Sequence, residues 1–146
     1  TGGRAAPDPL LRPWECGRPF TGPSDWLGTS AMPEKHLYRD YPGVDASMAD
    51  LRRPGMYGAY HEVTVAGKED ASKTKVYDVV GSLCENCDKV AVQRALPEIA
   101  PGDLLVIHDS GAHGRAMGFN YNAQPRGGQL LLLEDRPVRY IRPLEP

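Results

Sequence analysis

The sequence predicts a mainly β fold, a β-sandwich or barrel with one or two short helices. The 14 prolines and 16 glycines interrupt the 146-residue chain at short intervals, and such breaks disfavour long helices. Between them lie short apolar or β-branched runs, some of which alternate with polar residues as half-buried strands do. Strands of this kind joined by turns are typical of sandwiches and barrels.

Several segments carry the strand pattern. Residues 61–66 alternate as His-Glu-Val-Thr-Val-Ala, and residues 76–80 are rich in β-branched side chains. Residues 103–108 contain a Leu-Leu-Val-Ile run directly after a Pro-Gly pair, which favours a turn. Residues 129–134 are rich in leucine, and residues 137–142 alternate Val, Tyr and Ile with Arg. Each of these segments is predicted to be a strand.

Two segments are predicted to be helices. Residues 46–53 begin with Ser47 as a candidate N-cap, followed three residues later by Asp50, where a capping box prefers Glu or Gln. The Pro-Gly pair that follows is expected to end this helix. A second short helix is predicted near 89–96.

Composition and charge are those of one ordinary globular domain. Hydrophobic residues make up 40% and charged residues 25% of the chain, and the net charge is −2, so neither a nucleic-acid surface nor a polybasic membrane patch is expected. The longest uncharged apolar run, 130–133, is too short to cross a bilayer. No secretory signal is recognisable. We expect a cytoplasmic protein and, because the chain starts with Thr1, a processed or truncated product.

The octapeptide Gly-Ser-Leu-Cys-Glu-Asn-Cys-Asp at 81–88 is the most informative motif. It places the Cys84 thiol beside the Glu85 carboxylate just after a predicted strand, where scaffolds often display reactive groups. Taken alone, such a pair is more often a buried cysteine in a turn.

The three cysteines also permit other interpretations. Cys84 and Cys87 have the spacing of a redox pair or of half a zinc site. Structural zinc needs four ligands, however, and the sequence has no second closely spaced pair. We therefore expect no metal, and an odd number of cysteines does not make a disulfide framework.

Two charged clusters could bind polar ligands. Glu15 and Arg18 flank Gly17, so they could serve two ends of one ligand, although such pairs are mostly surface ion pairs. Arg53 and Tyr57 lie around a predicted helix end. They could hold a carboxylate through a guanidinium fork and a neutral hydrogen bond, or simply pack a turn.

Two loops near the end of the chain carry polar groups. In 108–114 the backbone amides of small residues could cradle a phosphate beneath His113. The consecutive His-Asp-Ser at the start of this loop is not a hydrolase triad, because neighbouring strand residues point to opposite faces. The Asn-Tyr-Asn turn at 120–122 is expected to cap backbone groups.

Taken in order, these motifs resemble the C-terminal portion of diaminopimelate decarboxylase, a pyridoxal-phosphate decarboxylase related to ornithine decarboxylase and alanine racemase. The resemblance runs from about Trp14 to Glu134. It rests on Glu-x-Gly-Arg at 15–18, Gly-Val-Asp-Ala-Ser-Met-Ala-Asp-Leu at 43–51, Arg-Pro-x-x-Tyr-Gly-Ala-Tyr-His at 53–61, Gly-x-x-Cys-Glu at 81–85, Pro-Gly-Asp-Leu-Leu at 101–105, and a Gly-Ala loop leading to Asn-Tyr-Asn.

The resemblance implies the domain organisation. Residues 1–13 would be an irregular segment, 14–30 a remnant of the junction between barrel and β-domain, and 31–146 the C-terminal β-domain, a β-sandwich or Greek-key barrel. The TIM barrel of the family, with its Schiff-base lysine, is absent from this chain, since such a barrel alone needs about 250 residues. The chain by itself is therefore expected to be inactive.

The resemblance also implies residues for pyridoxal 5'-phosphate. Glu15 would face the pyridine nitrogen, and Gly17 and Arg18 would lie beside the phosphate and the substrate. His113 stands where many relatives have Tyr and would still donate a hydrogen bond to the phosphate.

For the substrate, the resemblance implies that Arg53 and Tyr57 bind the distal carboxylate, Glu85 binds the distal ammonium, and Cys84 is the catalytic proton donor. Cys84 and Glu85 would reach into the partner subunit, so the working unit would be a homodimer. The implied reaction is decarboxylation of meso-2,6-diaminopimelate to L-lysine. The alternatives are a non-catalytic regulatory partner of such an enzyme, a decarboxylase of ornithine or lysine, or a Cys-x-x-Cys metal or redox module.

Overall fold

The computed structural model describes residues 26–35, 39–111, 113–133 and 137–142, and of 26–35 it describes the backbone. The predicted cofactor residues Glu15, Gly17 and Arg18 therefore lie outside the described residues, as does the predicted irregular segment 1–13.

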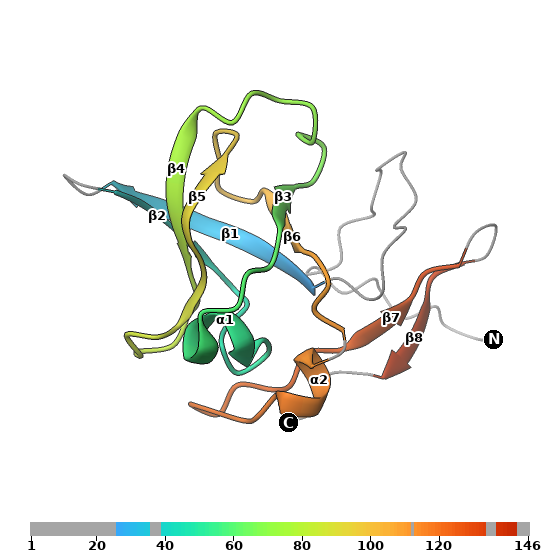
Figure 1. The fold of residues 1–146 in the computed structure, drawn as a ribbon. Coiled ribbons are helices and arrows are strands. Elements are labelled where there is room, and N and C mark those ends of the chain that lie inside the picture. The colour runs from blue at the N-terminus through green and yellow to red at the C-terminus, as the bar shows by residue number, and fades with distance from the viewer. Residues whose placement is uncertain (1–25, 36–38, 112, 134–136, 143–146) are drawn as a thin grey trace.

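The described chain is mainly β, with two short helices, as predicted (Figure 1). A six-stranded sheet has the order β3-β6-β1-β2-β4-β5, and a separate two-stranded sheet consists of β7 and β8. In chain order the elements are β1 Trp26–Lys35, β2 Asp40–Val44, α1 Arg52–Tyr57, β3 Val63–Val65, β4 Lys75–Val80, β5 Lys89–Leu96, β6 Leu104–Ile107, α2 Gly114–Met117, β7 Gln129–Leu131 and β8 Arg139–Arg142.

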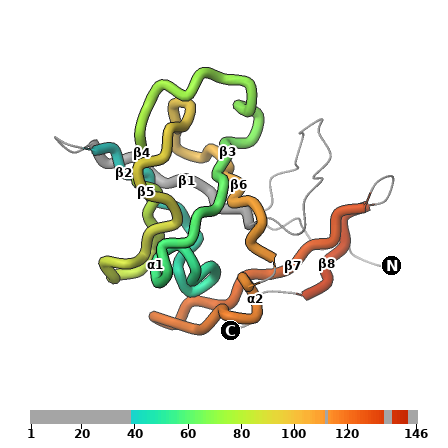
Figure 2. The backbone as a smooth tube through the Cα atoms, in the orientation of Figure 1, coloured from blue at the N-terminus to red at the C-terminus, as the bar shows by residue number. Residues whose placement is uncertain are grey.

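Strand β1 joins the two halves of the larger sheet. Its first residues pair with β6, from Trp26 opposite Ile107, and its later residues pair with β2. The register with β2 shifts after Ser30, so β1 carries a bulge, which bends a strand. Among the strands that the structure describes, β2 and β4 pair in parallel and all other neighbours are antiparallel. The edge strands β3 and β5 contact each other, so the sheet curls round a core without closing into a hydrogen-bonded barrel in the described part (Figures 1 and 2).

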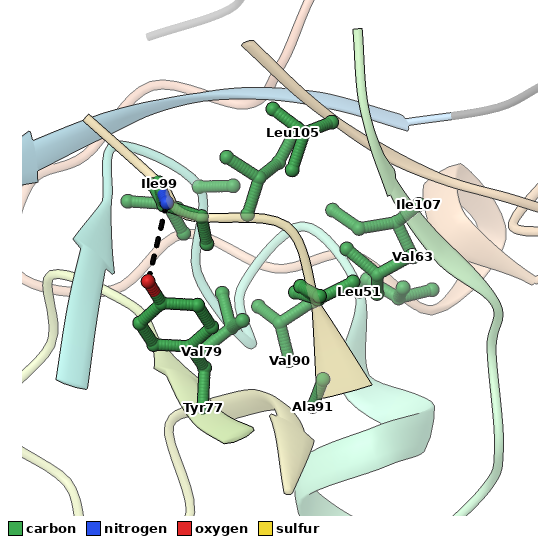
Figure 3. Close-up of a cluster of buried hydrophobic side chains, with 13 residues drawn as sticks. Leu51, Val63, Tyr77, Val79, Val90, Ala91, Ile99, Leu105 and Ile107 are labelled. Atoms are coloured by element: carbon green, nitrogen blue, oxygen red, sulfur yellow. Dashed lines mark hydrogen bonds between the residues drawn. The ribbon is translucent and has the colours of Figure 1, made fainter. Parts of the chain in front are cut away.

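The core fills the inside of this curl. Tyr77 is buried, and its hydroxyl accepts a hydrogen bond of 3.2 Å from the backbone N–H of Ile99, so the one polar atom of this ring is satisfied (Figure 3). The aliphatic residues around it include Leu51, Val63, Val79, Val90, Ala91, Leu105 and Ile107.

A buried carboxylate shapes the β4–β5 pair. Asp78 is fully buried and pairs with Arg39 at 2.7 Å. It also accepts a 2.7 Å hydrogen bond from the backbone N–H of Gln93, a residue with a positive φ of 50°. The register shifts between Tyr77 and Val79, which marks a bulge in β5 opposite Asp78.

The helix predicted at 46–53 was wrong in position, and the helix predicted near 89–96 was wrong in kind. Residues 48–50 form a turn, and α1 begins at Arg52, where the predicted helix was expected to end. Pro54 lies in the first turn of α1, where backbone N–H groups have no helical partner, so its missing N–H costs nothing. The segment 89–96 is strand β5: its pairing with β4 outweighs helix propensity, and the bulge at Gln93 disrupts the strand alternation. Strands β1 and β2 were not foreseen.

Candidate functional site

Three loops meet at one end of the curled sheet: 46–51 leading into α1, 81–88 between β4 and β5, and 118–124 after α2 (Figure 2). Hydrogen bonds join them. The N–H of Phe119 donates to the Ala49 carbonyl at 3.0 Å, and the amide of Gln124 donates to the Ser82 hydroxyl at 2.8 Å. A small apolar cluster lies between the loops and consists of Met48, Ala49 and Leu83 with Cys87, Phe119 and Tyr121 packed against it.

Asp88 fixes the shape of the 81–88 loop. Its buried carboxylate accepts the N–H groups of Leu83 at 2.7 Å and Met48 at 2.6 Å. The pKa of Asp88 is raised by burial, an effect that these two N–H donors oppose. A Cβ on Gly81 would lie 2.4 Å from both carboxylate oxygens, so only glycine fits there. The Asp88 carboxylate thus fixes the buried side of the loop, and the tip of the loop faces solvent.

Cys84 and Glu85 form that exposed tip, directly beyond β4. The side-chain amide of Asn122 donates to Cys84 Sγ at 3.5 Å, and the Tyr121 hydroxyl donates to the Glu85 carboxylate. The pKa of Tyr121 is raised by this hydrogen bond and by the negative charge of Glu85. Cys84 is therefore not the buried turn cysteine that an isolated Cys-Glu pair would predict.

Helix α1 carries Arg53 and Tyr57 and lies against the same loop. Arg53 is half-buried and Tyr57 is 64% exposed. At Gly55 the helix touches the main chain of the loop, at the Cys87 carbonyl. The Arg52 guanidinium lies 4.3 Å from the centre of the Phe119 ring, which couples α1 to the 118–124 loop.

His113 is exposed at the N-cap position of α2, a helix that contacts α1. The N–H of Gly114 donates to the Ser110 carbonyl at 2.8 Å, so this amide closes the loop itself. The Ser110 hydroxyl donates to the Ile107 carbonyl at 3.4 Å, and His108 Nε2 lies 2.9 Å from the Thr64 hydroxyl. Ser110 and His108 therefore engage other partners, as expected of a sequence without a hydrolase triad.

The thiols of Cys84 and Cys87 are both free. Cys87 is half-buried, with Sγ 3.3 Å from Met48 Sδ. Within the described ranges, no three His, Cys, Asp or Glu side chains are placed to hold a metal ion. No helix in the same residues has the length and apolar character to cross a membrane.

A surface hollow lies away from this end, beside the β3–β4 connection. It is lined by Lys68, Ala71, Ser72, Thr74, Pro97, Glu98 and Ala100. No predicted site residue lines it. Cys84, Glu85 and Tyr57 instead lie exposed on the surface at the other end of the sheet.

A sequence model of the pyridoxal-dependent decarboxylase C-terminal sheet domain matches residues 26–111. The chain belongs to this family. The resemblance drawn from the motifs is thereby confirmed, as is the mainly β domain without a TIM barrel.

Named relatives agree with this assignment. The chain is 48% identical over 131 residues to the protein TabA of Pseudomonas amygdali pv. tabaci, covering 90% of this chain and 31% of TabA. It is 43% identical to a diaminopimelate decarboxylase of Archaeoglobus fulgidus, covering 88% of this chain and 30% of that enzyme. A crystal structure of diaminopimelate decarboxylase from Helicobacter pylori with L-lysine superposes with a TM-score of 0.74 at 33% identity, covering 84% of this chain and 29% of that one.

Sequence reasoning missed four residues that shape the site: Gly55, Asp88, Tyr121 and Asn122. Tyr121 and Asn122 were interpreted only as part of a capping turn. Their proximity to the Cys-Glu pair depends on a contact between distant segments, which no local pattern reveals. Gly55 was interpreted only as part of the Pro-Gly pair that ends a helix, and its contact with the distant Cys87 carbonyl has no local signal.

Proposed function

We propose that this chain is the C-terminal sheet domain of a pyridoxal-phosphate enzyme that decarboxylates meso-2,6-diaminopimelate to L-lysine. The observation that carries the proposal is the exposed Cys84–Glu85 tip, held by Tyr121 and Asn122 and set against α1 with Arg53 and Tyr57. The diaminopimelate decarboxylase names of relatives at 43% and 39% identity support the same reaction. The chain spans about a third or less of these relatives, so the activity belongs to a larger protein.

The substrate has an amino-acid group at both ends, and this determines what its distal end needs. Glu85 binds the distal ammonium. Arg53 holds the distal carboxylate in a guanidinium fork, with Tyr57 adding a neutral hydrogen bond. Ornithine has no distal carboxylate, so it would leave Arg53 without a partner.

Cys84 returns a proton to the carbon from which carbon dioxide has left. Its exposed sulfur, at the outermost part of the loop, can approach a substrate held by another part of the protein. Bound pyridoxal phosphate supplies the electron sink for that carbon. Glu15, Gly17, Arg18 and His113 are the residues of this chain that would hold it, and the exposed place of His113 at the same end of the domain fits this role.

The open character of the site supports a homodimer. Cys84 and Glu85 are exposed at the tip of their loop, so a second subunit would cover them and complete the pocket. We assign 14–25 to the junction with the barrel and the residues from Trp26 onward to the sheet domain, because β1 begins at Trp26 and pairs there with β6. The boundary thus lies five residues before the predicted one at 31. We place the enzyme in the cytoplasm.

The decisive experiment uses the full-length protein that contains this chain, loaded with pyridoxal phosphate. We expect carbon dioxide and L-lysine from meso-diaminopimelate, and little carbon dioxide from ornithine or lysine. Preferential release from ornithine or lysine would contradict the assigned substrate. An inactive protein that changes the rate of an active homologue after mixing would establish the regulatory alternative instead.

A further inference from the structure

We propose that Tyr121 and Asn122 are positioning residues, Tyr121 for the carboxylate of Glu85 and Asn122 for the thiol of Cys84. The inference rests on the proposed function and assigns a task to the Asn-Tyr-Asn turn. Tyr121 and Asn122 are neighbours in the turn, and each donates a hydrogen bond to one residue of the neighbouring pair Cys84 and Glu85.

Tyr121 is itself held in place. Its ring lies edge-on to Phe119, with centroids 6.2 Å apart and planes at 67°, an arrangement that aromatic pairs favour. Phe119 in turn lies under the guanidinium of Arg52 in α1. A continuous set of contacts thus runs from the helix of Arg53 to the carboxylate of Glu85. This path fixes the spacing between the groups proposed to bind the distal carboxylate and the distal ammonium.

The hydrogen bond from Tyr121 also orients the Glu85 carboxylate. It engages Oε1, which leaves Oε2 to accept from the ammonium of a ligand. A carboxylate that is already oriented loses less rotamer freedom when the ligand binds. Removing the phenol hydroxyl is therefore expected to weaken binding of the distal ammonium more than it slows the chemical step.

Asn122 acts on the sulfur. Its amide N–H approaches Cys84 Sγ as a donor, so the thiol proton points elsewhere and is available to the substrate. Once the thiol has given up that proton, the sulfur is negatively charged and accepts the same N–H more strongly. Asn122 therefore favours the product side of the proton transfer, and its loss is expected to lower kcat rather than to raise KM.

The backbone at Asn122 decides which variants are informative. Asn122 has a positive φ of 51°, a conformation that Asn, Asp and Gly tolerate better than other residues. Asn122→Gly removes the amide without backbone strain. Asn122→Asp keeps the size and the backbone preference but replaces the donor with a carboxylate. Asn122→Gly thus isolates the side-chain hydrogen bond, whereas Asn122→Asp also adds a negative charge beside the thiol.

The test measures steady-state kinetics of the full-length enzyme with meso-diaminopimelate. A hydrogen bond to a charged group changes a binding or rate constant by a factor of roughly ten or more when it is shielded from water, and by less when it is exposed. We therefore expect Tyr121→Phe to raise KM about fivefold and to change kcat by no more than about twofold. Asn122→Gly and Asn122→Asp should lower kcat about fivefold with KM within about twofold. Tyr140→Phe, on exposed β8 outside the three loops, is the control and should change neither constant.

Unchanged constants in Tyr121→Phe and in the Asn122 variants would overturn the proposal. So would a parallel loss of kcat and kcat/KM in all variants with a lower Tm, because that pattern indicates damage to the fold alone.

Two further measurements need no substrate and separate this inference from the proposed function. The Tyr121 phenol, followed by ultraviolet absorbance, should titrate at lower pH in Glu85→Gln than in the wild type. The neutral variant Asn122→Gly, which removes the N–H donor to the sulfur, should slow alkylation of Cys84 by iodoacetamide about fivefold. If the wild-type enzyme does not decarboxylate meso-diaminopimelate, the proposed function fails, and these two readouts still decide the positioning roles. The positioning roles would be overturned if Tyr121 titrated at the same pH, and Cys84 were alkylated at the same rate, in the wild type and in these variants.

Discussion

Gly55 of α1 faces the carbonyl oxygen of Cys87 so closely that a Cβ at this position would lie 2.1 Å from that oxygen. The helix that carries Arg53 and Tyr57 therefore rests on the main chain of the loop that carries Cys84 and Glu85. A direct contact between two backbone segments therefore determines how far the side chains of α1 lie from the Cys-Glu tip. Such a contact leaves little room for adjustment.

Replacing Gly55 with Ala should therefore affect both stability and substrate binding. We expect a loss of about 1–3 kcal/mol in the free energy of unfolding, because the helix must move away from the loop, together with a higher KM for the substrate. Denaturant unfolding and steady-state kinetics of the full-length enzyme measure the two effects. Gly67→Ala is the matched control: it has open space and a positive φ of 76° far from the site, so it should cost about 1 kcal/mol with KM unchanged. Wild-type values in Gly55→Ala would refute the close contact.

Cys84→Ala should slow turnover with little loss of bound cofactor. A positioned general acid typically contributes a factor of 100 or more, so we expect kcat to fall by about 100-fold. Cofactor absorbance and carbon dioxide release measure the two quantities in one sample. Cys87→Ala, at the half-buried neighbour against Met48, should leave kcat close to that of the wild type. Full activity in Cys84→Ala would remove this thiol from the mechanism.

The buried Asp88 should make stability depend on pH. Its pKa is raised in the folded protein, mainly by burial, so the folded state binds this proton more tightly than the unfolded chain does. The corresponding stabilisation is present below the unfolded pKa of 3.8 and is lost as the pH rises through the folded pKa. In Asp88→Asn this dependence disappears. The difference in unfolding free energy, wild type minus variant, should therefore decrease from pH 4 upward; a difference that grows with pH would show that the pKa is lowered instead.

Asp78 should be required for the bulge in β5. Asp78→Ala leaves the part-buried N–H of Gln93 without its charged acceptor, which should lower the free energy of unfolding by about 1–3 kcal/mol. Asp78→Asn keeps an acceptor oxygen and should cost less, although it loses the ion pair with Arg39. Urea unfolding of the two variants side by side gives the comparison. Equal losses would mean that the charge of Asp78, and not its hydrogen bond to Gln93, supports the bulge.

The local sequence pattern was sufficient to predict a strand where turns bound that strand on both sides. The segments 76–80 and 103–108 were predicted from their apolar runs, and they correspond to β4 and β6. The local pattern gave a wrong prediction where a contact with a distant segment determines the local structure. The Pro-Gly pair after residue 53 signals a helix end, yet it lies inside α1, because Pro54 occupies the first turn and Gly55 meets a distant carbonyl. Strands β1 and β2 each contain a proline, which weakens the pattern of a strand before its partners are known.

The candidate site divides in the same way. Cys84 and Glu85 are neighbours in sequence, so their proximity could be predicted. Tyr121 and Asn122 reach them only across a separation of 36 to 38 residues, through the packing of the 118–124 loop on two others. Nothing in the sequence of that turn indicates which loop it contacts. The roles assigned to Arg53, Tyr57 and His113 stay predictions until the complete enzyme is tested.

The bulged strand β1 has a consequence for how the domain forms during synthesis. Strands β2, β4 and β5 are available once Leu96 has left the ribosome, whereas the start of β1 must wait for Ile107 before it can pair with β6. High contact order of this kind slows folding to milliseconds or longer, and the half-formed sheet meanwhile exposes a bare strand edge. Pairing of β1 with β6 is therefore expected to be a late step, after β2, β4 and β5 have met.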